Sequence, residues 1–542
     1  MPSGSKQVRD EEENSIRTPA RLGFSFFVLV LAINLYHHAM WFDELQAWSY
    51  TSAAPNPWAL VQGLTPEGHP ALWYLVLWLP TRLTSNPHVM QGVVFIMGAI
   101  SYYLLWLRSP FTTIEKFMLS TSYQIGFLYS VVSRGYSLGM MILFLFLAGF
   151  PHKERVWMGW LLLGLLANVH LYFTMLSVVL ALYWILAEES PVRPLERSFS
   201  LYLTSVFFSA LVMLSFVAEN QSTAPYLTVV VVPIALLGLL LWGSSHLVAR
   251  VKNLSYILLA AFVAGLAALT TLLPETTLAR DGIRVASSIG ALGQGLLPLH
   301  NYTKSYYWEA SMSNIISVPL FFTALALIGY LLRKSATSLP LFLLQAFMML
   351  VVFIARQPGL DWHAGILFLT LVSFLWIDPK SYPTTKSARV TLLVFLTIPA
   401  LSGLHANINS KIHPLSGSPT TARWLLEHQD SVDTIIANRM FPTISVATMM
   451  QQELYFPEVR KKIAHLHWGV WVRRSKVPKI VADRMAACNA ETAFFLHPVG
   501  DISRMERHLK EYENLRIEQK YEVGDGLIEN YVIYRLRLVK TP

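Results

Sequence analysis

Long apolar runs, separated by short polar connections, fill most of the chain up to about residue 410. The first run extends from Gly23 to about Met40, behind a polar segment of 22 residues, and is long enough to cross the hydrocarbon core of a bilayer. Twelve further runs lie near 88–107, 117–132, 137–150, 157–170, 172–187, 200–217, 226–243, 254–273, 313–332, 339–355, 362–377 and 389–406. The pattern predicts a polytopic α-helical membrane protein with about 13 transmembrane helices.

The C-terminal part of the chain has the pattern of a soluble domain. From Pro414 to Pro542 no apolar stretch is long enough to span a bilayer. Helical periodicity in TARWLLEHQ and ISRMERHLKEY alternates with strand-like DTIIAN, ETAFFLHP and NYVIYRLRL, which predicts a small α/β domain. We therefore expect a cytoplasmic N-terminal segment (1–22), a transmembrane domain (23–410, with a first outer loop at 41–87) and an extracytoplasmic domain (414–542).

Composition supports this interpretation and excludes others. Charged residues make up 14% of the chain, against roughly 25% in soluble domains, and 54% of the residues are apolar. The net charge of +9 is spread over 542 residues, and apolar runs separate the charged residues. This excludes nucleic-acid binding as the main function. The single cysteine, Cys488, excludes an intramolecular disulfide and a multi-cysteine metal site, and we expect it to be a small buried side chain.

The distribution of basic residues predicts the orientation. With a cytoplasmic N-terminus, the predicted inner segments hold 17 Lys and Arg residues, and the outer loops before Lys411 hold 6. This is the bias that sets membrane topology. An odd number of spans then places the C-terminal domain outside. An exported domain without disulfides favours the plasma membrane of a bacterium, that is, its inner membrane.

The first outer loop carries the first candidates for chemistry. Asp43 and Glu44 follow the first span directly, and His69 opens a tryptophan-rich stretch. We expect Trp41, Trp48, Trp58, Trp73 and Trp78 to lie at headgroup depth, where the indole ring is favoured. An acidic pair after a span is also common as a solvated helix end, so these residues alone do not establish a site.

The predicted topology brings further polar side chains to the same face. They come from later outer connections and comprise Arg134, Tyr136, His170, Arg280, Arg284, Lys304, Arg356 and His363. A carboxylate, several cations and aromatic rings at a membrane surface could hold a lipid-linked phosphate, stack on a sugar and deprotonate an acceptor. Individually, Arg134 could snorkel to the interface, His170 could cap a helix and Lys304 could face solvent.

Four motifs in this order resemble the GT-C superfamily of integral membrane glycosyltransferases, in particular the branch of protein O-mannosyltransferases and lipid A aminoarabinose transferases. They are Phe42-Asp43-Glu44, the stretch HPALWYL from His69, the stretch SRGYSL from Ser133, and Asn168-Val169-His170-Leu171-Tyr172. The resemblance covers residues 41 to 172. Beyond them it is one of architecture: thirteen spans and an outer C-terminal domain.

The resemblance implies a polyprenyl-phosphate-linked sugar as donor and a glycolipid, glycan or protein as acceptor. Asp43 would be the general base on the acceptor, with Glu44 and His69 as secondary catalytic or positioning groups. Arg134, followed by Arg280, Arg284, Lys304 and Arg356, would bind the donor phosphate. Tyr136, His170 and His363 would position their neighbours.

Val132 stands where the family has a glutamate, and no spacing of acidic residues and histidines demands a metal. A divalent cation is therefore left open, and no cofactor is expected. Two other classes remain as alternatives: a polytopic transporter or lipid flippase, and a GT-C-like scaffold without activity. Against transport, the polar residues gather at the outer face instead of the midplane, and no inverted repeat is visible.

Overall fold

The structure is a computed structural model, and it describes residues 4–64, 69–150, 156–186, 199, 201–206, 208–209, 281–303, 305–308, 313–355, 360–467 and 472–539. The chain divides into two compact units. A helical unit comprises Met1–Ile33, Leu64–Trp73 and Val94–Ile408, and a sheet unit comprises Asn34–Gly63, Tyr74–Val93 and Asn409–Pro542. Most of the first outer loop thus groups with the C-terminal domain, whereas the sequence pattern placed it in the transmembrane domain.

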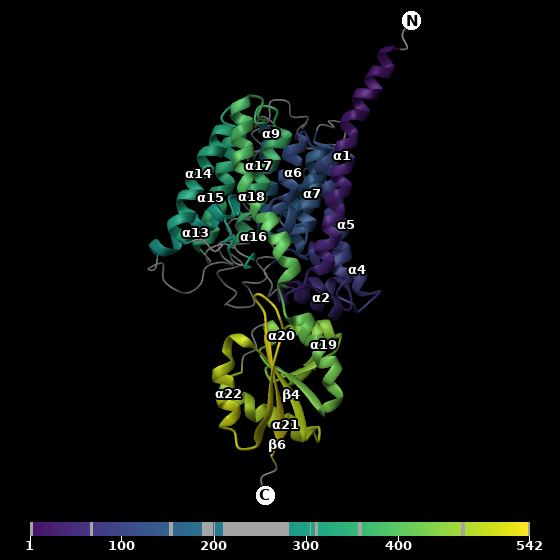
Figure 1. The fold of residues 1–542 in the computed structure, drawn as a ribbon, viewed down its shortest axis with the longest axis vertical. Helices are drawn as coiled ribbons and strands as arrows, with labels where there is room; N and C mark the ends of the chain where they lie inside the picture. The colour runs from purple at the N-terminus through teal and green to yellow at the C-terminus, as the bar shows by residue number, and fades with distance from the viewer. Residues whose placement is uncertain are drawn as a thin grey trace, which may run out of the picture. The chain divides into compact units, whose positions relative to one another are not determined.

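The predicted apolar runs that the structure describes are helical (Figure 1). The helices are α1 (Gly4–His37), α5 (Val89–Leu107), α6 (Thr113–Thr121), α7 (Gly135–Gly149), α8 (Val156–Ala167), α9 (Leu171–Leu186), α13 (Asp281–Leu296), α14 (Asn314–Leu332), α15 (Ser338–Ala355), α16 (Asp361–Ala364), α17 (Ile366–Ile377) and α18 (Lys386–Ile412). The runs predicted at 226–243 and 254–273, and most of the run at 200–217, lie outside the described residues.

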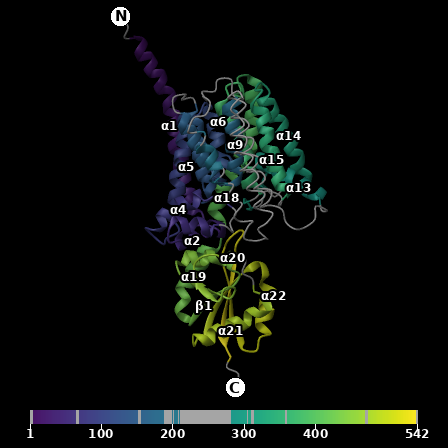
Figure 2. The same ribbon diagram turned by 180° about the vertical axis from the view of Figure 1, so that it is seen from behind.

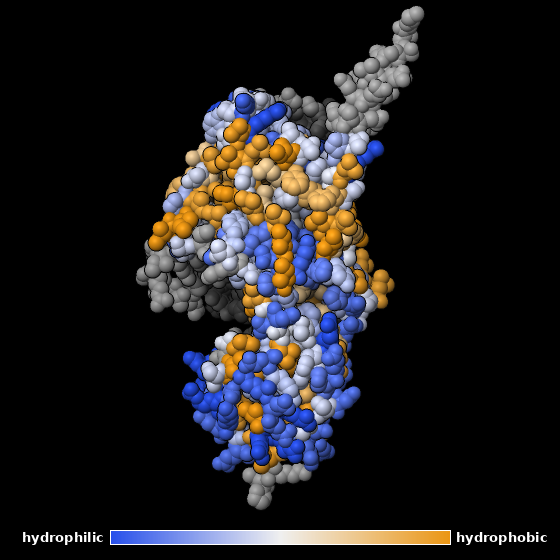
Figure 3. Space-filling model, viewed as in Figure 1, coloured by the Kyte–Doolittle hydropathy of each residue, from blue (hydrophilic) through white to orange (hydrophobic). Residues whose placement is uncertain are grey.

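Among the described residues, four helical stretches are long and apolar enough to cross a membrane: Thr18–His37, Val89–Leu107, Asn314–Leu332 and Lys386–Ile412. The other apolar helices of the helical unit are shorter. The surface of the helical unit is compatible with a membrane. On the face shown in Figure 3, hydrophobic residues cover much of the helical unit, while hydrophilic residues dominate the sheet unit. These helices indicate that the protein associates with a membrane, but they do not establish the number of transmembrane helices.

The predicted run at 117–132 is one apolar segment in the sequence but two elements in the structure. Helix α6 ends at Thr121, and a π-helix, η2 (Tyr123–Leu128), follows. Ser122 between them has extended backbone angles, and its hydroxyl accepts a hydrogen bond from the N–H of Ile125 at 3.3 Å. A serine that caps the next element in this way ends the preceding helix without a proline.

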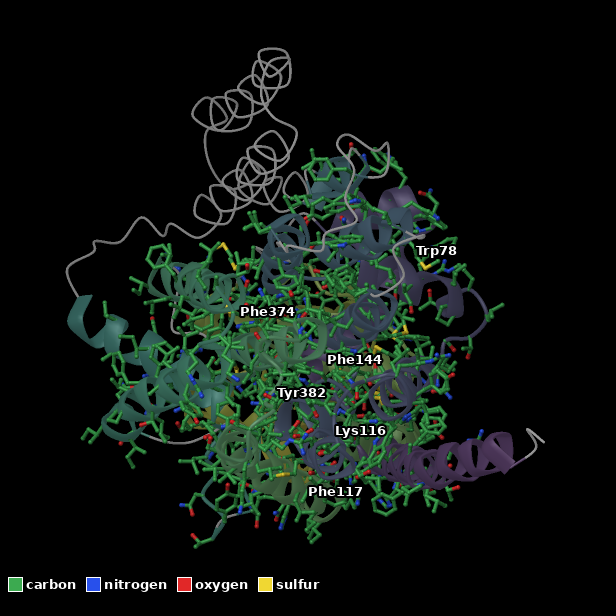
Figure 4. The ribbon with its side chains drawn as sticks, turned by 90° about the horizontal axis from the view of Figure 1, so that it is seen from above. Trp78, Lys116, Phe117, Phe144, Phe374 and Tyr382 are labelled. Atoms are coloured by element: carbon green, nitrogen blue, oxygen red, sulfur yellow. The ribbon has the colours of Figure 1, made fainter. Side chains whose placement is uncertain are left out.

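A buried carboxylate and a neighbouring ammonium group bind backbone groups at one predicted inner connection. Glu115 completes a capping box at the start of α6 and accepts a hydrogen bond from the hydroxyl of Tyr382 at 3.1 Å. The ammonium of Lys116 donates to the backbone oxygen of Trp106 at 2.9 Å. Figure 4, a view from above, labels Lys116 and Tyr382 together with Phe144 and Phe374 of the packed helices α7 and α17. Glu115 and Lys116 thus form hydrogen bonds with backbone groups at helix ends that have no partner within their own helix.

The sheet unit contains a six-stranded mixed sheet with the order β3-β2-β1-β4-β6-β5. Its strands are β1 (Thr434–Ala437), β2 (Leu454–Phe456), β3 (Lys461–Ile463), β4 (Thr492–Pro498), β5 (Leu515–Val523) and β6 (Tyr531–Leu538). Strand β1 pairs in parallel with β2 on one side and β4 on the other, and β3, β5 and β6 pair antiparallel with their neighbours. The predicted strands at DTIIAN, ETAFFLHP and NYVIYRLRL are confirmed as β1, β4 and β6.

Helices cover both faces of this sheet (Figure 2). Helices α19 (Ser418–His428) and α20 (Met440–Met450) pack on a core with Phe456, Phe494 and Ile533, while α21 (Val477–Ala487) and α22 (Ile502–Lys510) pack on a core with Phe495 and Val532. Because successive strand residues point to opposite faces, adjacent residues such as Phe494 and Phe495 serve both cores.

Three short helices lie in the described part of the first outer loop: α2 (Phe42–Ala53), α3 (Pro57–Gly63) and α4 (Leu72–Thr81). Helix α2 packs against α20, where the rings of Phe42 and Phe441 lie 4.5 Å apart.

Trp41, Trp48 and Trp73 are buried among other side chains, while Trp58 is exposed. Their depth in a membrane stays a prediction. One expectation about the C-terminal domain was wrong. Cys488 is exposed at the end of α21, where its thiol contacts the backbone oxygen of Arg484 at 3.1 Å.

Candidate functional site

A cluster of histidine and tyrosine rings, distant in sequence, occupies the helical unit. We call His69, Tyr136, His170, Tyr172 and His363 the histidine–tyrosine cluster. His69 precedes α4, and Tyr136 lies in the first turn of α7. His170 precedes α9, Tyr172 lies in the first turn of α9, and His363 lies in α16. Four of the five are residues that the sequence singled out, and they come from four separate segments.

Close ring contacts hold the histidine–tyrosine cluster together. The ring of His170 lies 4.6 Å from that of His69, 5.0 Å from that of Tyr136 and 5.6 Å from that of His363. The ring of His363 in turn lies 4.8 Å from that of Tyr172. The hydroxyl of Tyr136 is 3.3 Å from Nε2 of His170.

The imidazole of His170 has a preferred proton arrangement. Its Nδ1 accepts a long hydrogen bond from the backbone N–H of Tyr172 at 3.4 Å. In the neutral ring the proton then lies on Nε2, which can donate to the hydroxyl of Tyr136.

Backbone contacts fix the segments that carry the histidine–tyrosine cluster. The N–H of Leu72 donates to the carbonyl of Asn168 at 3.2 Å, which joins the His69 segment to the turn before α9. Gly135 lies against both: a Cβ there would stand 3.2 Å from Cβ of Trp73 and 3.5 Å from the side chain of Val169. Glycine at this point lets the start of α7 approach the other two segments closely.

The start of α7 combines two features that favour an anion. Arg134 is its N-cap residue, and its side chain is half-buried. The 15-residue helix directs the positive end of its dipole toward the same point. Tyr136, in the first turn, stacks on Tyr129 at 5.3 Å, and the hydroxyl of Tyr129 donates to the backbone oxygen of Trp362 at 2.7 Å.

The acidic pair of the first outer loop belongs to the sheet unit, and its two members differ. Glu44 is buried and binds Nε2 of His38 at 2.9 and 3.0 Å, and it accepts a hydrogen bond from the N–H of Trp41 at 3.0 Å. It therefore caps the start of α2 and holds the end of α1. Asp43, in the same first turn, is half-buried.

Four predicted phosphate ligands cannot be placed. Arg280, Lys304 and Arg356 lie outside the described residues, and the side chain of Arg284, in α13, is not described either.

Sequence reasoning assigned no role to three residues that the structure brings into contact with predicted ones, and of these it had named only Trp362 as a neighbour of His363 on the same predicted face. His38 pairs with Glu44, Tyr129 stacks on Tyr136, and Trp362 precedes His363, with a ring 5.3 Å from that of Trp308. Their position at the ends of apolar runs, next to residues already singled out, was the only signal in the sequence. Tyr172 was quoted within a motif but was given no role.

The three clustered histidines do not form a metal site. Within the residues that the structure describes, no group of three His, Cys, Asp or Glu side chains is suited to hold a metal ion. The imidazole of His170 lies against those of His69 and His363, at interplanar angles near 30°. Comparison with family models, with curated proteins and with solved structures finds no match.

Proposed function

We propose that this protein is an integral membrane glycosyltransferase that moves a sugar from a polyprenyl-phosphate donor to an acceptor at the outer face of the membrane. One observation supports the proposal most directly: His69, Tyr136, His170 and His363, taken from separate outer connections of the sequence, pack ring against ring.

The chemistry of the histidine–tyrosine cluster suits a sugar phosphate. Arg134 and the N-terminus of α7 favour the phosphate, whose negative charge grows as it leaves the anomeric carbon. The hydroxyl of Tyr136 and the imidazoles offer hydrogen bonds to sugar hydroxyls. Asp43 takes the proton of the acceptor hydroxyl or amine as the acceptor attacks the anomeric carbon.

The proposal includes the finer topology predicted from the sequence. It has about thirteen spans, a cytoplasmic N-terminus, an extracytoplasmic C-terminal domain and residence in the bacterial inner membrane. The helices long enough to span and the charge bias between the predicted inner and outer connections support this arrangement.

The first test replaces the proposed base. Asp43→Asn keeps the size and hydrogen-bonding capacity of the side chain but removes its basicity, so sugar transfer from a polyprenyl-phosphate donor should fall by at least a hundredfold. Transfer is measured with the purified chain in nanodiscs, against Asp483→Asn, an exposed carboxylate on α21, as the matched control. Equal transfer by both variants would remove Asp43 from the mechanism and favour a transporter or flippase.

The second test concerns the donor phosphate. Arg134→Ala should raise the donor KM and lower kcat, because the charge-assisted contact with phosphate strengthens as the leaving group develops charge. The control is Arg333→Ala, because Arg333 follows α14 in a connection that is predicted to lie on the inner face of the membrane. A variant at Arg134 with an unchanged donor KM and kcat would show that this arginine is structural.

A further inference from the structure

Polar side chains gather where the parallel strands of the sheet unit end. Strand β1 has a parallel neighbour on each side, and helices α20 and α21 cover opposite faces of the sheet. In open α/β sheets, a crevice forms outside the carboxyl ends of the strands at such a point, and ligands bind there. Here this edge holds the residues that follow β1, the end of β4 and the turn between β2 and β3.

The edge contains polar groups that an apolar core does not require. Asn438, directly after β1, and His497, near the end of β4, are both buried and are joined by a contact of 3.0 Å between Nδ2 and Nδ1. Arg439 follows with a left-handed backbone, at φ 61°, which a non-glycine residue adopts at a cost of about 1 kcal/mol or more. This backbone turns the chain sharply from β1 into α20.

Glu458, in the β2–β3 turn, has a carboxylate oxygen with unused capacity. Its Oε1 accepts a hydrogen bond from the N–H of Arg439 at 2.7 Å, at the start of α20. Its Oε2 is shielded from solvent, and no described residue donates to it. Burial raises the pKa of Glu458, and backbone N–H groups oppose that rise. A buried acceptor without a donor points to a ligand that brings one.

The same features decide the chemistry of that ligand. The carboxylate of Glu458 already occupies the start of α20, so a second anion there would meet like charge. The guanidinium of Arg439 opposes a cation in the same way. A neutral molecule with hydroxyl groups can donate to Oε2 of Glu458 and accept from Arg439, as saccharides do.

An aromatic surface lies next to this edge. Phe441, in the first turn of α20, is 39% exposed, and its ring lies 4.5 Å from that of Phe42, in the first turn of α2. The contact joins the starts of the two helices, and Asp43 is the neighbour of Phe42. A flat apolar ring beside planar polar groups is suited to the C–H face of a sugar.

We propose that the carboxyl edge of this sheet, with Arg439, Phe441 and Glu458, is a binding site for the saccharide part of the acceptor. The inference rests on the proposed glycosyl transfer and names its acceptor class. The sheet unit contributes both the general base Asp43 and the groups that hold the acceptor beside it.

The test measures saccharide binding apart from transfer. Saturation-transfer NMR with the full chain in nanodiscs uses three neutral probes, methyl β-glucopyranoside, methyl α-mannopyranoside and lactose, with glucose 6-phosphate as the anionic comparator. At least one neutral probe should bind. Glu458→Gln, which keeps the cap but turns the free acceptor into a donor, and Phe441→Ala should each raise its Kd at least tenfold.

Two controls keep the outcome specific. Glu453→Gln, an exposed carboxylate just before β2, should bind the probe as the wild type does, and thermal unfolding of every variant verifies its fold. Asp43→Asn should bind the probe normally while losing transfer. Binding to the wild type that Glu458→Gln and Phe441→Ala leave unchanged overturns the inference, as does a preference for glucose 6-phosphate or no binding of any neutral probe. Unchanged transfer by Asp43→Asn, in contrast, overturns the proposed function and leaves the binding result standing.

Discussion

At the scale of single residues, neighbouring acidic side chains have different tasks. Asp43 and Glu44 look equivalent in the sequence, since both follow the first apolar run. In the structure Glu44 is fully buried between His38 and the backbone of Trp41, while Asp43 remains partly accessible. A group buried in this way holds helices in place, and only the accessible one can reach an acceptor.

Replacing Glu44 should therefore lower the free energy of unfolding of the protein. Glu44→Ala leaves His38 buried without its carboxylate partner and α2 without its cap, which should destabilise the protein by about 2–4 kcal/mol. Thermal unfolding in nanodiscs measures the effect, with Glu427→Ala on the exposed side of α19 as the control. Equal melting temperatures for the two variants would contradict the structural role of Glu44.

A buried carboxyl in the sheet unit should make stability depend on pH. Glu529 binds the hydroxyls of Ser416, Ser445 and Tyr531, the last at 2.6 Å. Burial raises the pKa of Glu529 to about 7, although these hydrogen bonds lower it in part. The fold therefore favours the protonated form.

The sign of the pH effect follows from that direction. The ordinary pKa of a glutamate is 4.5, so the contribution of Glu529 is complete below pH 4.5 and is lost as the pH rises through about 7. The loss amounts to about 3 kcal/mol at most. Glu529→Gln mimics the protonated carboxyl, and its unfolding free energy should exceed that of the wild type increasingly between pH 5 and pH 8. A parallel pH dependence of both proteins would contradict the prediction.

At the scale of elements, the break between α6 and η2 shows how a close helix contact depends on glycine. A Cβ at Gly403 of α18 would collide with the backbone of Thr121, Ser122 and Tyr123. Backbone atoms cannot move aside as a flexible side chain can, so α18 would have to shift.

Two glycine substitutions separate this contact from helix propensity. Gly403→Ala should lower stability by about 1–3 kcal/mol or more, because of overpacking. Gly329→Ala, in α14 with open space around it, should raise stability by about 0.5–1 kcal/mol through helix propensity. Scanning fluorimetry compares them in the same nanodiscs. A stabilising Gly403→Ala would mean that α18 does not approach the break this closely.

At the scale of the whole molecule, the single cysteine can report the orientation. Cys488 is exposed in the sheet unit, and the charge bias predicts that this unit lies outside the cytoplasm. A membrane-impermeant maleimide should label the wild type in intact spheroplasts. Ala336→Cys in a Cys488→Ser background, in the predicted inner connection after α14, should label only after lysis. The reverse pattern would invert the topology.

Local pattern determined much of the fold. Apolar runs predicted the positions of most described helices, because a helix that crosses a membrane needs a long continuous apolar stretch. Alternation predicted β1, β4 and β6, because a strand has a period of two. The short strands β2 and β3 carried too few residues to show a period, and the serine cap at Ser122 split a run that looked continuous.

The sequence predicted only some of the residues of the candidate site. The predicted outer connections pointed to His69, Tyr136, His170 and His363, because the predicted topology brings polar residues beside these apolar runs to one face. Their packing, the capping role of Glu44, and the contact of Phe42 with Phe441 were decided by tertiary structure alone. Contacts between segments far apart in the chain depend on how every intervening helix packs, and no local period encodes that.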